Sequence, residues 1–170
     1  MKVAVLGGSG YLANILRIKK DKKIKFIFFS RKLKNKINYN SFKDLESKLK
    51  NFDCIIHLVG MHKNATYNKK NESINLKKDL TEKICALVNK YKIRLIYVSS
   101  IQIYQNFDRQ NILKNKSPID TKSIYSKAHY VAEKIIKKKL ISTPHQFQII
   151  RLANVFGFRN KMNKFSIKKI

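Results

Sequence analysis

The sequence predicts an α/β fold with a doubly wound parallel sheet, and three observations support this. Short apolar segments alternate with longer amphipathic segments along the chain. The apolar segments are almost continuous, which is typical of strands that are buried on both faces. Small or polar residues follow the apolar segments, beginning with a glycine turn after the first. Continuous apolar strands separated by amphipathic helices indicate a parallel sheet with helices on both faces.

The first half of the chain contains three predicted strands and two predicted helices. Residues 3–6 form a short apolar strand, and the helix expected over 10–19 has Leu12, Ile15 and Leu16 on one side. Residues 24–29 are apolar apart from one lysine and form the second strand. In the helix expected over 41–50, Phe42, Leu45 and Leu49 stand at helical spacing after the N-cap residue Ser41. Residues 54–59 form the third strand.

The second half contains two more helices and two more strands. The long helix expected over 71–91 has an inner stripe made of Ile74, Leu80, Ile84, Leu87 and Val88. Residues 95–98 form the fourth strand, a helix follows over 123–140, and residues 147–152 form the fifth strand. We expect the polar segment 105–122 to be a loop that could cover a site.

Composition indicates one globular domain with an unusually basic surface. The chain has 170 residues, 44% of them hydrophobic, and a formal net charge of +28. Six of its 38 basic residues are arginines and the rest are lysines, which are spread along the whole chain. This favours a solvated lysine-rich surface over a specific nucleic-acid footprint. Cys54 and Cys85 lie in apolar patterns, so we expect reduced core cysteines and a cytoplasmic protein; no apolar run could cross a membrane.

The glycine turn after the first strand predicts a site for a dinucleotide. It has the sequence Gly7-Gly8-Ser9-Gly10-Tyr11-Leu12-Ala13 and lies between a predicted strand and a predicted helix. Glycine allows backbone angles that a side chain forbids and lets a pyrophosphate approach the main chain at a helix N-terminus. The small residue Ala13 permits close packing of helix against strand.

The end of the second strand predicts which dinucleotide is preferred. NAD is normally held by a carboxylate at this place, but the sequence here is Ser30-Arg31-Lys32. The two cations and the serine hydroxyl suit a 2′-phosphate, so we expect a preference for NADP, with NAD still possible. A surface pair in a lysine-rich chain is the alternative.

Six motifs in order give the chain its resemblance to a known family. They are the glycine turn, residues 53–60, Asn75-Leu76, residues 97–100 with Tyr104, residues 125–133, and residues 151–157. Together they resemble the extended short-chain dehydrogenase/reductases, specifically the NAD(P)-dependent nucleotide-sugar epimerases and dehydratases. The likeness covers residues 1–158 and implies a Rossmann-like domain, with a role in surface-polysaccharide synthesis.

The resemblance implies a role for individual residues. Cofactor contacts fall on Gly7, Ser9, Gly10, Tyr11, Leu12, Ser30, Arg31, Lys32, Leu58, Val59, Gly60, Asn75 and Ser99. Ser100 would hydrogen-bond the reacting sugar oxygen, Tyr125 would act as the acid/base, and Asn154 would contact the substrate. No metal site is expected, and His57 matches a structural histidine of the family.

The chain departs from the family pattern at residue 129. A lysine usually follows the catalytic tyrosine by four residues and lowers the pKa of that tyrosine, whereas this chain has His129. His129 could bind the ribose hydroxyls and orient Tyr125, or it could merely pack beside the cofactor. Tyr130 and Lys134 offer a second register, which we reject because Tyr130 points to another side of the helix.

The predicted organisation is an incomplete dinucleotide-binding domain over 1–158, followed by a basic tail over 159–170. The carboxyl-terminal substrate domain of the family is missing from this sequence, and the exposed edge that results could favour a homodimer. The expected function is an epimerase, dehydratase or reductase that acts on a nucleotide sugar. A catalytically inactive dinucleotide-binding module and a nucleic-acid binder are the alternatives.

Overall fold

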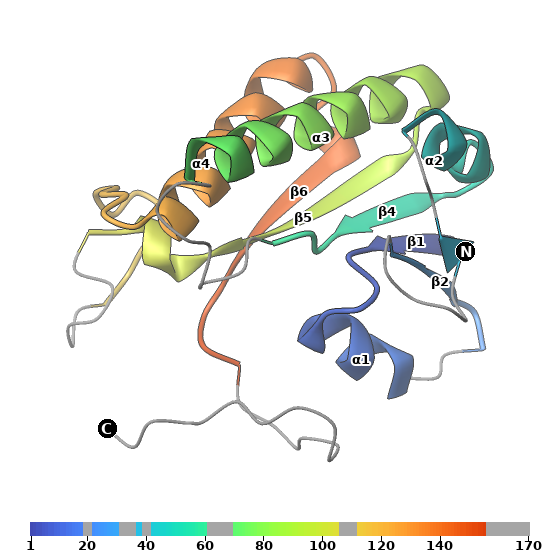
Figure 1. The fold of residues 1–170 in the computed structure, drawn as a ribbon, viewed down its shortest axis with the longest axis horizontal. Helices are drawn as coiled ribbons and strands as arrows, with labels where there is room; N and C mark the ends of the chain where they lie inside the picture. Colours follow the sequence, from blue (N-terminus) through green and yellow to red (C-terminus); the bar gives the residue numbers. More distant parts are fainter. Residues whose placement is uncertain (19–21, 31–36, 39–41, 61–69, 106–111, 156–170) are drawn as a thin grey trace.

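A six-stranded parallel sheet forms the centre of the molecule in a computed structural model (Figure 1). The structure describes residues 1–18, 22–30, 37–38, 42–60, 70–105 and 112–155. The strand order is β3-β2-β1-β4-β5-β6, and every pair of neighbouring strands is parallel. The chain therefore reverses its direction of winding between β1 and β4, and ligands of such sheets bind at this switch point.

Strands and helices alternate along the chain, as the apolar pattern predicts. The strands are β1 (Lys2–Leu6), β2 (Lys25–Ser30), β3 (Ile37–Asn38), β4 (Cys54–His57), β5 (Arg94–Ser100) and β6 (Phe147–Leu152). The α-helices are α1 (Tyr11–Ile18), α2 (Phe42–Leu49), α3 (Lys70–Tyr91) and α4 (Ile124–Lys139). Two short 3₁₀ turns, Ile101–Ile103 and Pro144–Gln146, complete the described elements.

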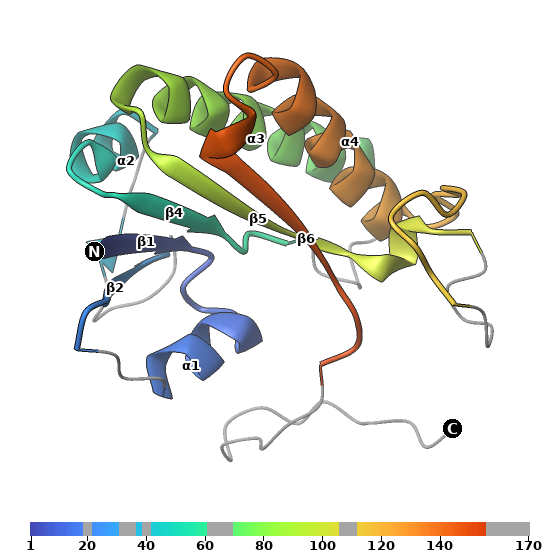
Figure 2. The same cartoon turned by 180° about the vertical axis from the view of Figure 1, so that it is seen from behind.

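Helices cover both faces of the sheet. Helices α2, α3 and α4 lie on one face and α1 lies on the other, as the front and back views both show (Figures 1 and 2). The larger apolar cluster packs between the sheet and α2–α4, and its fully buried side chains include Leu45, Ile84, Leu95 and Ile136. A smaller cluster around Val3, Val5 and Ala13 packs α1 against the sheet. The layers confirm the predicted doubly wound α/β class.

The structure corrects three details of the predicted elements. The sheet has a sixth strand, β3, which the sequence did not predict because two residues carry no periodicity. β4 ends at His57 rather than at residue 59, although the Leu58 amide still donates to the Leu6 carbonyl at 2.9 Å. β5 continues through Ser99 and Ser100, because both residues stay in register with Arg151 and Leu152 of β6.

Several predictions concern residues outside the described part of the chain. These are the cap residue Ser41, the cations Arg31 and Lys32, residues 106–111 of the polar segment, and the tail over 159–170. The cysteines fall within the described part: Cys54 and Cys85 are both buried and free, as predicted. None of the described helices is long and apolar enough to span a membrane.

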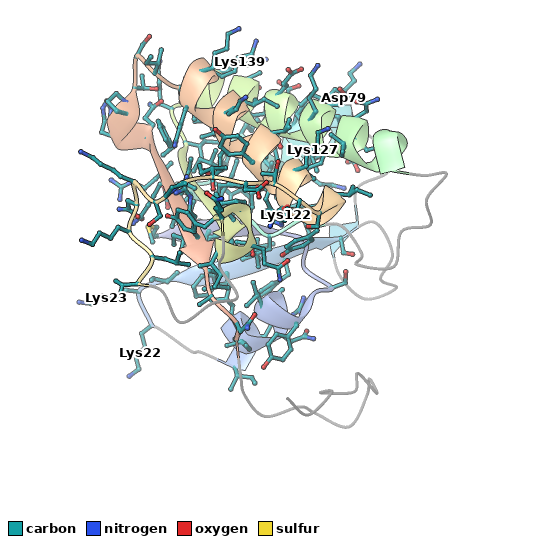
Figure 3. The ribbon with its side chains drawn as sticks, turned by 90° about the vertical axis from the view of Figure 1, so that its left-hand side faces the viewer. Lys22, Lys23, Asp79, Lys122, Lys127 and Lys139 are labelled. Atoms are coloured by element: carbon teal, nitrogen blue, oxygen red, sulfur yellow. The ribbon has the colours of Figure 1, made fainter. Side chains whose placement is uncertain are left out.

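Lysine side chains project outward from well-separated parts of the molecule. Lys22 and Lys23 lie near the lower edge in Figure 3, whereas Lys139 lies at its top. Such scatter fits the predicted solvated surface.

Candidate active site

The turn between β1 and α1 folds as the glycine pattern predicts. Gly7 has a φ of +87°, and a Cβ atom there would lie 2.9 Å from the backbone carbon of Leu58. The Gly10 amide donates to the Gly7 carbonyl at 3.0 Å, and α1 begins at the next residue. The first amides of a helix have no intrahelical acceptor, so they make this turn suitable for an anion.

A pocket of about 410 Å³ lies beside this turn, at the carboxyl ends of β4, β5 and β6. The first turn of α1, the end of β5, the start of α4 and the segment after β6 form its walls. The lining residues are Tyr11, Leu12, Leu58, Gly60, Val98, Ser99, Ser100, Gln102, Tyr125, His129, Leu152, Ala153, Asn154 and Val155. Its volume is typical of a small-molecule site.

Two serines at the end of β5 bring hydroxyl groups to the pocket. The Ser100 hydroxyl oxygen accepts from the Gln102 amide at 3.2 Å, where it caps the 3₁₀ turn. Because this bond uses a lone pair of the oxygen, the hydroxyl proton of Ser100 can still be donated to a ligand. The Ser99 hydroxyl is buried and has no hydrogen-bond partner among the described residues.

The first two turns of α4 bring Tyr125 and His129 to the same pocket. Ser123 caps the helix in a reciprocal capping box with Ser126, which fixes where the helix starts. Tyr125 and His129 are one helical turn apart, so they share a face of α4. Their ring centroids are 4.6 Å apart, with the rings edge to face.

Behind the pocket wall, His129 contacts two buried polar groups. Its Nδ1 atom lies 2.9 Å from the Tyr97 hydroxyl and 3.4 Å from the Lys77 ammonium nitrogen. The Lys77 nitrogen also donates to the Val59 carbonyl at 3.2 Å. The Nε2 atom of His129 is buried and has no partner among the described residues.

Burial shifts the pKa values of this cluster toward uncharged forms. It lowers the pKa of His129 to about 3, with the Lys77 charge as a second cause. It lowers the pKa of Lys77 to about 7 and raises the pKa of Tyr97 well above its usual value. His129 is therefore neutral near pH 7, whereas Lys77 is partly charged.

His57 has the structural role that the sequence indicated. It is fully buried at the end of β4, and its Nδ1 atom accepts from the Val59 amide at 3.3 Å. Burial, with Lys77 and His129 nearby, lowers its pKa to about 3. The described residues contain no group of three or more His, Cys, Asp or Glu side chains that could hold a metal ion.

The alternative register on α4 is turned away from the pocket. The Lys134 nitrogen lies 5.1 Å from the centre of the Tyr130 ring, and neither residue lines the pocket. Glu133 also points away from the pocket, because its buried carboxylate forms an ion pair with the guanidinium of Arg151 on β6, with 2.7 Å between Oε2 and Nη2. Tyr125 and His129 thus form the pair that faces the pocket.

The described part of the polar segment 105–122 lies along another cavity. Tyr104 bridges to Ile119, and the Arg151 guanidinium donates to the carbonyl of Asn115. Leu113 and Asn115 line a space of about 420 Å³ with Glu133 and Arg151. No residue among 112–122 lines the pocket at Tyr125, so this part does not cover it.

The structure brings most, but not all, of the predicted site residues to the pocket. Lining it are Tyr11, Leu12, Leu58, Gly60, Ser99, Ser100, Tyr125, His129 and Asn154. Gly7, Ser9, Ser30 and Val59 lie at strand ends or turns nearby, without lining it, and Asn75 is exposed on α3. Lys77 was not predicted as a site residue, although its spacing from Ile74, Thr81 and Ile84 places it on the inner stripe of α3.

Comparison with models of known protein families shows which family this chain belongs to. The model of the NAD dependent epimerase/dehydratase family matches residues 3–170. The chain belongs to this family. A comparison with curated protein sequences finds no match.

Solved structures of enzymes that act on nucleotide sugars have the same fold. UDP-N-acetylglucosamine 4-epimerase from Bacillus cereus aligns with a TM-score of 0.76 and 22% identity, over 95% of this chain and 59% of that one. UDP-glucuronic acid 4-epimerase from Bacillus cereus, in complex with NAD, aligns with a TM-score of 0.76 and 15% identity, over 92% of this chain and 58% of that one.

A reductase gives a similar alignment. dTDP-4-dehydrorhamnose reductase from Bacillus anthracis, in complex with NADP, has a TM-score of 0.68 and 16% identity, over 89% of this chain and 53% of the reductase. At these identities the likeness shows the fold. The chain of 170 residues thus spans somewhat more than half the length of these structures.

Proposed function

We propose that this chain is the dinucleotide-binding part of an NAD(P)-dependent enzyme that epimerises, dehydrates or reduces a nucleotide sugar. One observation carries the proposal: Ser100, Tyr125 and the first turn of α1 line the same pocket. A ligand in this pocket could contact a hydroxyl donor, a phenol and the first amides of a helix together, which supports the proposal. The family resemblance adds a role in surface-polysaccharide synthesis.

The polar groups of the pocket fit a dinucleotide. The buried Ser99 hydroxyl and His129 Nε2 have no partner among the described residues, and a buried polar atom without a partner is costly unless a ligand satisfies it. In our proposal the turn from Gly7 to Leu12 holds the pyrophosphate, and the segment from Leu58 to Gly60 lines the middle of the cofactor. When bound, the nicotinamide accepts or supplies a hydride.

The side chains of Ser100 and Tyr125 supply the acid/base chemistry in this proposal. Hydride transfer at a sugar carbon requires that the attached oxygen lose or gain a proton. The Ser100 hydroxyl donates a hydrogen bond to that oxygen, and the Tyr125 phenol gives or takes the proton. His129 orients Tyr125 through the ring contact, and Asn154, which also lines the pocket, contacts the substrate.

We propose NADP as the preferred coenzyme, with NAD as the alternative. Ser30 lies at the carboxyl end of β2, where the adenosine ribose of such folds is bound. The sequence continues with Arg31 and Lys32, and their charges suit a 2′-phosphate. Related structures hold either NAD or NADP.

The substitution Tyr125→Phe tests the proposal. It removes the phenolic proton but leaves the ring that packs on His129, so coenzyme affinity should stay within about two-fold while turnover falls at least about 100-fold. Turnover is measured with a substrate-binding domain of the family joined to the chain, as the absorbance of reduced nicotinamide and as product formed from a panel of UDP- and dTDP-sugars. Unchanged turnover in the variant would exclude Tyr125 as the acid/base.

A second candidate function is a dinucleotide-binding module without catalytic activity. His129 favours it, because a histidine with a pKa of about 3 carries no positive charge where the family pattern has a lysine. Coenzyme binding by the wild type, with no turnover of any sugar nucleotide even when a substrate-binding domain of the family is joined to the chain, would support this candidate.

A further inference from the structure

Lys77 is the one lysine that the fold buries, among the residues whose exposure the structure describes. It is 6% exposed, on the inner face of α3, between Ile74 and the buried Thr81. The described ion pairs do not include it. A buried ammonium is costly to keep, which suggests that the position has a use beyond packing.

The ammonium of Lys77 joins the elements that form the pocket. It donates to the Val59 carbonyl, in the segment after β4, at 3.2 Å. It lies 3.4 Å from His129 Nδ1 on α4, and 5.5 Å from the ring centre of Tyr97 on β5. Through His129 it reaches the pocket, although Lys77 itself does not line it.

These contacts determine which nitrogen of His129 holds the proton. Nδ1 faces the ammonium of Lys77, which can only donate, and the hydroxyl of Tyr97 at 2.9 Å. Because the charged ammonium has no lone pair, Nδ1 must accept from Lys77, and the proton of the neutral ring then lies on Nε2. The Tyr97 hydroxyl, which can donate or accept, then donates to the same Nδ1 atom. His129 then presents a buried N–H donor, without a partner among the described residues, at the pocket wall.

We propose that Lys77 is a positioning residue of the dinucleotide site: with Tyr97 it holds His129 as the neutral Nε2–H tautomer, which donates to a hydroxyl oxygen of the bound dinucleotide. In this way α3 also supplies the positive charge that the Tyr-x-x-x-Lys pattern would place on α4. The part of this inference that concerns the dinucleotide rests on the proposed function. The part that concerns His129 stands on the contacts alone.

The charges around Lys77 support this role. Its ammonium faces His57 on β4, Tyr97 on β5 and His129 on α4. The charge of Glu133, which pairs with Arg151, acts on Tyr97. Burial and the Lys77 charge both lower the pKa of His129, to about 3. At pH 6 Lys77, with a pKa of about 7, is mostly charged while His129 is still neutral.

The tautomer can be measured directly by NMR on the full chain with ¹⁵N-labelled histidine, without coenzyme. In the wild type at pH 6, His129 should be neutral, with its proton on Nε2. In Lys77→Met, which keeps the side-chain length but removes the charge, the titration midpoint of His129 should rise by about one pH unit, a ten-fold change in protonation. Lys78→Met, the neighbouring exposed lysine on α3, is the matched control and should behave as the wild type.

Two NMR results would overturn the inference. One is a wild-type His129 with its proton on Nδ1, which requires no variant to fold. The other is a Lys77→Met spectrum in which His129 titrates as in the wild type, with the melting temperature confirming that the variant is folded.

Coenzyme affinity separates this inference from the proposed function. NADPH fluorescence should show affinity about ten-fold weaker in Lys77→Met and unchanged within about two-fold in Lys78→Met. Equal affinity in Lys77→Met and the wild type would overturn the inference while leaving the proposed function intact. A wild-type chain that binds neither NADPH nor NADH would overturn the proposed function instead.

Discussion

At the scale of single residues, Gly7 shows why the turn after β1 cannot carry a side chain. Its φ of +87° lies in the region that residues other than glycine rarely adopt. A Cβ atom would also meet the backbone of Leu58 and Val59 at 2.9–3.0 Å, and the Leu58 amide is held in place by its hydrogen bond to the Leu6 carbonyl. Both strain and close approach therefore require glycine.

Gly7→Ala should lower the free energy of unfolding by about 1–3 kcal/mol, because it combines an unfavourable φ with a steric contact. Urea denaturation measures this difference. Gly60→Ala is the matched control, because a Cβ atom at Gly60 would come no closer than 4.0 Å to another atom. Equal loss of stability in both variants would contradict this account of Gly7.

Lys77 marks the limit of what the sequence predicts at this scale. Ser100, Tyr125 and His129 were identified because they stand in recognisable motifs, and the fold brings all three to one pocket. Lys77 has no motif, and the inner stripe of α3 was defined by its apolar residues alone. A lysine in helical register with that stripe is the pattern that could have revealed it.

At the scale of elements, the interior between α3, α4 and the sheet contains two histidines that burial keeps neutral. His57 lies at the end of β4 and His129 on α4, and the pKa of each is lowered from 6.5 to about 3. Between these two pH values the unfolded chain binds protons that the folded chain does not. Stability is therefore present above about pH 6.5 and is lost as the pH falls.

We expect the free energy of unfolding to decrease from pH 6.5 to pH 5, by up to about 1.4 kcal/mol per pH unit for each histidine. Lys77 is mostly charged in both states below pH 6 and adds little to this slope. Urea denaturation at several pH values measures the slope, which should be smaller in His57→Gln. The control is His145→Gln, at an exposed position, which should leave the slope unchanged. An equal slope in the wild type, His57→Gln and His145→Gln would refute the claim that buried His57 contributes to the pH dependence.

The elements themselves were largely predictable, because four amphipathic helices have apolar residues at helical spacing and five strands are nearly continuous apolar segments. The ends of the strands were not. Whether β4 stops at His57 and β5 continues to Ser100 depends on pairing with neighbouring strands, which a single segment does not encode. For the same reason the two-residue β3, paired with the end of β2, was missed.

At the scale of the whole molecule, the basic residues are dispersed, whereas the candidate site is confined to one pocket. The labelled lysines are distributed over separate parts of the molecule (Figure 3), whereas the pocket brings together residues of α1, β5 and α4 at the carboxyl ends of the strands. The strand order reverses between β1 and β4, and this reversal creates the crevice at the carboxyl ends of the strands where the pocket lies. The pocket, and not the net charge, therefore carries the functional proposal.

The measurement that tests this claim most directly is a thermal-shift titration of the chain with NADP and with NAD, for the wild type and Gly10→Val. A coenzyme at 100 times its dissociation constant should add about 2.7 kcal/mol of stability to the wild type, with NADP effective at the lower concentration. An added Cβ at Gly10 would come no closer than 3.4 Å to the Gly7 carbonyl oxygen, so the variant should fold. The thermal shift should disappear in this variant, because the valine side chain occupies the space where the pyrophosphate approaches the main chain. No shift with either coenzyme in the wild type, or an equal shift in Gly10→Val, would contradict a dinucleotide bound at this turn.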